Sequence, residues 1–204
     1  MNPIIRIKYG NFLEPIFESH YRAQPGEADW IAYPPEQTHE IIRAYDAAWK
    51  PYKSRILDGL HSITGLEFFQ NTIDVFIVSS LRGGFSVPMV ISAQKEPDLF
   101  IDILSHELIH RLLTDNTASG EYNWREAQQK IFPDITEPKV INHIFVHAIL
   151  KSLYLDVLEE PSRLMRDIAR CERFADYKRA WEIVERNDYR TIIENLRREI
   201  FTQP

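Results

Sequence analysis

Residues 102–115 read DILSHELIHRLLTD, and this stretch carries the clearest chemical signal in the chain. It places His106, Glu107 and His110 in the spacing H-E-x-x-H within a run that is otherwise mainly apolar. Residues four apart lie on the same face of an α-helix, so two histidines at this spacing can reach one metal ion. The pattern predicts a helix that carries a metal site. The alternative is a core helix whose two histidines are satisfied by hydrogen bonds.

Glu107 directly follows the first of these histidines, where its carboxylate can act on a water molecule without binding the metal itself. Zinc lowers the pKa of a bound water toward neutrality, and a neighbouring carboxylate can then take its proton. We therefore interpret His106 and His110 as ligands of Zn²⁺ and Glu107 as a general base.

The composition excludes several other classes of protein. The chain has 204 residues, enough for one domain with a substantial core, and its net charge is -6. That charge argues against broad attraction to nucleic acid or to an anionic membrane. Cys171 is the single cysteine, so no intrachain disulfide can form, and we expect it to be a small core residue. With no signal pattern at the N-terminus and no apolar run of membrane-spanning length, we expect a soluble, cytoplasmic protein.

The first sixty residues are predicted to hold a strand and a divided helix. Residues 4–9 (IIRIKY) favour a strand, and the proline-rich stretch 24–37 favours a loop. Residues 38–60 favour a helix with Thr38 as its N-cap and Pro51 as the point where it kinks or divides.

The next segment changes to a strand pattern. Residues 73–81 and 85–93 are rich in β-branched and aromatic residues, and Gly83-Gly84 between them predicts a hairpin turn. Pro88 cannot donate a hydrogen bond to a sheet, so the second strand is expected at an edge.

The remainder is predicted to be helical. The motif helix follows Pro97, a short helix covers 124–131, and a helix apolar on nearly every side covers about 138–158. Two or three further helices follow Ser162, with a break near Asn187-Asp188. We expect a single domain, 1–204, with an α/β part of about 1–115 and a helical part of about 116–204.

A motif helix that follows an edge strand resembles the zincin metallopeptidases. The resemblance covers roughly residues 70–158 and is specific only at HELIH. It implies an α+β, zincin-like fold in which a small mixed sheet packs on the motif helix and the C-terminal portion is helical. It also implies that a peptide substrate lies extended along the edge strand near residues 85–92.

The resemblance also bears on the third ligand. The metzincin branch needs Gly at 113 and His at 116, whereas this chain has Leu113 and Asn116, which excludes that branch. The gluzincin branch carries N-E-x-x-x-D on a later helix, with the Glu as ligand, and here Asn142 is followed by His143 and His147. This makes His143 the first choice for the third ligand and His147 the residue that supports it, although the reverse assignment remains open.

Other residues compete for these roles. The rival ligands are carboxylates in or near loops: Glu121, Glu126, Asp134 and Glu137. Asp102 lies four residues before His106 and is either a hydrogen-bond partner for that ligand or an exposed helix residue. Three residues are candidates to stabilise an oxyanion: Tyr122, Lys151 and Tyr154.

The sequence therefore predicts a zinc-dependent hydrolase, most simply a metallopeptidase that acts on a peptide or protein. The alternative is a metal-binding or protein-interaction module on a zincin scaffold, without catalysis. A site closed by four histidines would leave no open position for water, and this is what gives the alternative its weight.

Overall fold

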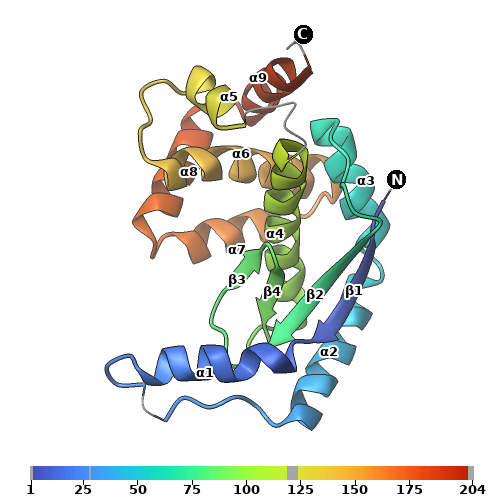
Figure 1. The fold of residues 1–204 in the computed structure, drawn as a ribbon. Coiled ribbons are helices and arrows are strands. Elements are labelled where there is room, and N and C mark those ends of the chain that lie inside the picture. Colours follow the sequence, from blue (N-terminus) through green and yellow to red (C-terminus); the bar gives the residue numbers. More distant parts are fainter. Residues whose placement is uncertain (1, 28, 119–123, 202–204) are drawn as a thin grey trace. The chain divides into compact units, whose positions relative to one another are not determined.

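The computed structural model describes residues 2–27, 29–118 and 124–201 (Figure 1). These residues form a mixed α+β structure with a small mixed sheet, which confirms the predicted class at that level. The chain divides into two units. Unit 1 comprises Met1–Lys53 and Gln70–Leu108, and unit 2 comprises Ser54–Phe69 and Ile109–Pro204. That the two make a single domain stays a prediction.

Unit 1 is built on a sheet with the strand order β1-β2-β4-β3. β2 (Thr72–Val78) pairs in parallel with β1 (Ile4–Tyr9) on one side and with β4 (Met89–Ser92) on the other. β3 (Gly84–Ser86) pairs antiparallel with β4 and forms an edge. All four side chains of β4 are buried, and β2 alternates half-buried with buried positions over most of its length. This alternation places the core of unit 1 on one face of β2.

A long connection joins β1 to β2, as a parallel pair requires. It contains η1 (Asn11–Leu13), α1 (Glu14–Arg22), α2 (Pro35–Trp49) and α3 (Lys53–Thr64). The predicted division at Pro51 is confirmed, because α2 ends before it and α3 begins after it. The predicted N-cap at Thr38 is wrong. The helix starts one turn earlier, at Pro35, where the missing N–H of proline costs no hydrogen bond.

The predicted hairpin at Gly83-Gly84 is also wrong. Gly84 is the first residue of β3, and the observed hairpin turns between Ser86 and Met89. β2 does not pair with β3, but runs parallel to β4. Pro88 lies in the turn, where its lack of an N–H is harmless. The edge position therefore belongs to β3 and not to the whole stretch 85–93.

Hydrogen bonds of Glu14 connect the start of α1 to the residues that follow β2. Its side chain is buried and accepts hydrogen bonds from Ser79 N and Ser79 Oγ at 2.8 Å and from Ser80 N at 2.8 Å. Ser80 Oγ also donates to the Glu14 backbone carbonyl at 3.1 Å. One carboxylate thus satisfies two buried backbone N–H groups that follow the strand.

Unit 2 is helical. It contains α3, the second part of α4 (Pro97–Ala118), α5 (Trp124–Ile131), α6 (Pro138–Ser152), α7 (Pro161–Cys171), α8 (Ala175–Arg186) and α9 (Tyr189–Phe201). α6 continues into a π-helical segment, η2 (Leu153–Val157), and packs against α8 and α9. The predicted helices at 124–131 and 138–158, and the break near Asn187-Asp188, are confirmed.

α6 and η2 together form a long, mainly apolar helical stretch. By length and composition Pro138–Val157 could cross a membrane, which corrects the expectation that no apolar run reaches that length. Of the stretch that passes this test, 72% is buried inside the molecule. Such burial is typical of a core helix, and it agrees with the prediction of a helix apolar on nearly every side.

We predict that Glu14→Ala destabilises the protein by about 3 kcal/mol, because the backbone N–H groups of Ser79 and Ser80 lose a buried acceptor. Urea unfolding followed by circular dichroism measures the change. The matched control is Glu40→Ala, which removes an exposed carboxylate paired with Arg43 at 3.9 Å. We expect no measurable change in the control. Equal stability of the two variants would contradict the role given to Glu14.

Candidate metal centre

α4 carries the H-E-x-x-H residues on one continuous helix. It begins at Pro97 with Asp98 in its first turn, and both residues favour a helix N-terminus. The boundary between the units falls within this helix, after Leu108. The helix itself therefore sets the spacing of His106 and His110. His106 is buried and His110 is half-buried.

His143 on α6 is the third member of the group. One ring nitrogen each of His106, His110 and His143 lies within 4.8 Å of the others, close enough for the three to hold a metal ion. Within unit 2, the rings of His110 and His143 are 4.9 Å apart between centroids and inclined at 74°. These are three of the four histidines that the sequence predicted as ligands.

Hydrogen bonds set which nitrogen each ring can offer. His143 Nδ1 lies 2.7 Å from the Lys139 carbonyl oxygen, which can only accept, so Nδ1 carries the proton and Nε2 presents a lone pair. Gln128 donates to Asn142 Oδ1 at 3.3 Å, and Asn142 Nδ2 in turn donates to His110 Nδ1 at 3.4 Å. The Lys139 contact thus makes Nε2 the natural ligand atom of His143. In His110 the Asn142 amide makes Nδ1 the acceptor, so the proton of the neutral ring lies on Nε2.

Burial keeps these imidazoles neutral. Desolvation, with a smaller effect from His143, lowers the pKa of His110 to about 3. The pKa of His143 is also lowered by desolvation, and its bond to the Lys139 carbonyl offsets part of this. A histidine must be neutral to bind a metal, so both rings are in the required state at neutral pH.

Glu107 lies against the edge strand of unit 1. A Cβ atom added at Gly84, the first residue of β3, would be 3.0 Å from Glu107 Oε1. Added at Gly83, it would meet nothing within 4 Å. The carboxylate thus occupies space that a side chain at position 84 would take.

His147 belongs to a different group. It lies one turn beyond His143 on α6, and together with Asp167 and Cys171 on α7 it forms a second set of buried potential metal ligands, again within 4.8 Å. Its ring stacks on Trp181 with centroids 4.3 Å apart. Sequence reasoning gave no metal role to Asp167 or Cys171. The only signal was their spacing of four on a helix, which is common without a metal.

Cys171 is buried, as predicted, and burial with the nearby Asp167 carboxylate raises the pKa of its thiol to about 12. A thiol with such a pKa is protonated at neutral pH and is a poor nucleophile. This agrees with the expectation that Cys171 is not catalytic.

The other candidates are members of neither group. Asp102 is fully buried, which excludes the alternative of an exposed helix residue. Lys151 pairs with Glu185 at 2.5 Å, and Tyr154 is buried in η2. The described rival carboxylates join neither group: Glu126, Asp134 and Glu137. Glu121 and Tyr122 lie outside the described residues.

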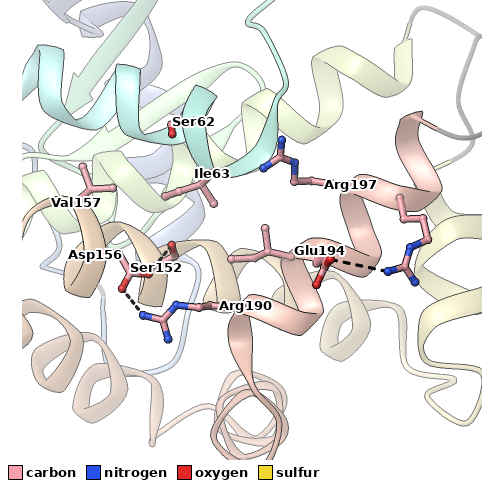
Figure 2. Close-up of a pocket in the computed structure, with 10 residues that line it drawn as sticks. Ser62, Ile63, Ser152, Asp156, Val157, Arg190, Glu194 and Arg197 are labelled. Atoms are coloured by element: carbon pink, nitrogen blue, oxygen red, sulfur yellow. Dashed lines mark hydrogen bonds and ion pairs between the residues drawn. The ribbon is translucent and has the colours of Figure 1, made fainter.

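A separate cavity of about 770 Å³ opens within unit 2 (Figure 2). α3, α9 and the end of α6 with η2 line it, and Asp156 is its most connected group. Asp156 accepts hydrogen bonds from Ser152 Oγ at 3.0 Å, Tyr189 OH at 3.0 Å and Arg190 at 2.6 Å. No histidine lines this cavity, so it is distinct from both histidine groups.

Comparisons of the chain with models of protein families, with curated proteins and with solved structures gave no match. Any function assigned to the chain therefore rests on the geometry of the two groups.

Proposed function

We propose that the protein is a zinc-dependent hydrolase, most simply a metallopeptidase of the zincin type. The observation that supports this most directly is the grouping of His106, His110 and His143, with Glu107 next to the first of them in the chain. Three nitrogen ligands match the set that catalytic zinc sites use when they keep one position open.

The residues present fit this ion. Neutral imidazole is a good ligand for Zn²⁺, and the bond from His143 Nδ1 to a backbone carbonyl is of the kind that orients metal-binding histidines. His106, His110 and His143 would hold the metal. When bound, Zn²⁺ would polarise a substrate carbonyl and make water more acidic.

Side chains and backbone of the protein would transfer the proton and bind the substrate. Glu107 would accept a proton from the attacking water at its carboxylate and pass it on to the leaving amine. Glu107 and His110 are half-buried, whereas His106 and His143 are buried, so the first two side chains would be the more accessible to water and substrate. In unit 1, β3 offers an edge next to Glu107 along which an extended peptide could pair.

The placement of His147 bears on the alternative of a closed, non-catalytic metal site. Such a site would need His147 as a fourth ligand beside the other three. Its inclusion in a different group, with Asp167 and Cys171, favours three histidines and an open position. We also propose that the protein is cytoplasmic and that its substrate is a peptide or a protein.

We expect His110→Ala and His143→Ala each to bind one equivalent of zinc fewer per chain than the unchanged protein, because each removes a ligand from the same ion. Elemental analysis of untagged protein, reloaded with zinc after chelation, measures this. The control is His20→Ala, an exposed histidine on α1 outside both groups. Undiminished zinc content in both ligand variants would contradict the assignment.

We expect Glu107→Gln to lower hydrolytic activity by about a hundredfold or more, since the amide cannot accept a proton. Its zinc content should remain that of the unchanged protein, because Glu107 is not a ligand. Cleavage of a mixed peptide library, read by mass spectrometry, tests this. Activity that survives the substitution would exclude Glu107 as the base, and absence of cleavage in the zinc-loaded, unchanged protein would favour the non-catalytic alternative.

We expect Gly84→Ala to lower kcat by about tenfold, because the new methyl group would push the Glu107 carboxylate out of place. The contact is with the end of a flexible side chain, so folding and zinc content should change little. Gly83→Ala is the matched control, since its methyl group would meet nothing within 4 Å. Equal kcat values in the two variants would show that Glu107 does not act from this position.

A further inference from the structure

Two helices of unit 2 bring three different kinds of metal ligand to one buried point. α6 contributes the imidazole of His147, and α7 contributes the carboxylate of Asp167 and the thiol of Cys171. Asp167 and Cys171 are four residues apart, so both lie on the side of α7 that meets His147. All three side chains are at most 3% exposed.

The Asp167 carboxylate is oriented by its neighbours. Arg170 donates to Oδ1 at 2.5 Å and places a positive charge beside this buried carboxylate. Oδ2 accepts two hydrogen bonds, one from the Cys171 thiol at 3.7 Å and one from Trp181 Nε1 at 3.2 Å. A carboxylate oxygen has two lone pairs, so once the Cys171 thiol has lost its proton the indole bond leaves Oδ2 able to bind a metal.

Trp181 also orients His147, the third potential ligand. Its indole stacks on the His147 ring with an angle of 9° between the two planes. One tryptophan on α8 therefore orients both His147 and Asp167. Partners of this kind around metal ligands hold the donor atoms in place before the ion arrives.

We propose that His147, Asp167 and Cys171 form a second metal site, one that takes a thiophilic divalent ion such as Zn²⁺. Binding breaks the S–H bond of Cys171, forms a metal–sulfur bond and releases one proton to solvent. The sulfur, nitrogen and oxygen donors suit zinc, whereas a site for Mg²⁺ or Ca²⁺ would be built from oxygen alone. Because these ligands are all buried, the ion would tie α6 to α7 and have a structural role.

This inference does not rest on the proposed hydrolase, and one experiment separates the two. Metal-free, full-length protein is titrated with Co²⁺ near neutral pH until its absorbance is constant. A thiolate bound to Co²⁺ gives near-ultraviolet charge-transfer absorption, which histidine and carboxylate ligands do not give. Cys171 is the single cysteine in the chain, so this band reports on the second site alone.

We expect the band to saturate at one Co²⁺ per chain and to disappear in Cys171→Ser together with one equivalent of bound metal. His110→Ala, which alters the histidine group of α4, should keep the band. Asp167→Asn keeps the thiol and an oxygen acceptor for Trp181, and it should weaken Co²⁺ binding at this site by about tenfold or more. Circular dichroism confirms that each variant is folded.

Two results would overturn the proposal. The first is a folded, unchanged protein that shows no charge-transfer band in excess Co²⁺. The cluster would then be a hydrogen-bonded core network in which the Cys171 thiol donates to Asp167. The second is a band whose Co²⁺ affinity is the same in Asp167→Asn, which would exclude the three-residue site.

Discussion

Desolvation of imidazole groups is the constraint on which the interior of unit 2 depends. His143 and His147 lie on α6, among apolar side chains that exclude water, and His110 lies beside His143. Burial lowers the pKa of each ring and removes the charged form at neutral pH. A neutral imidazole still has one donor and one acceptor nitrogen, and the surrounding helices must provide for both. The partners that these helices supply then decide which nitrogen can meet a metal.

The sequence predicted most of the helices because their signals are local. The apolar pattern, Pro51 and the Asn187-Asp188 break are each read within a few residues, and the helix boundaries follow them. The prediction of a hairpin turn at Gly83-Gly84 was wrong for a different reason. Gly83-Gly84 has the composition of a tight turn, but β2 pairs in parallel with β4, and parallel pairing depends on contacts between distant segments. No pattern within residues 73–93 distinguishes the two arrangements.

The residues of the candidate sites could likewise be predicted only in part. The spacing of His106 and His110 follows from the helix itself, and His143, which the resemblance indicated, belongs to the same group. Asp167 and Cys171 could not be found from sequence. Their helix has a strong division between polar and apolar faces, and nothing local shows that the Asp167 face is buried. Only the packing of α7 near α6 and α8 turns a common i,i+4 pair into potential ligands.

His143 and His147 are adjacent turns of one helix, yet their surroundings favour different chemistry. His143 is grouped with imidazoles alone, and its companion His110 is half-buried, an arrangement that suits a position open to water. His147 meets a carboxylate and a thiol where no ligand is exposed, and this suits a closed site. The same helix could therefore support an open centre on one turn and a closed one on the next. An ion bound at the closed centre would fix α7 against α6 and hold α6 in place, so that His143 stays where the open centre needs it.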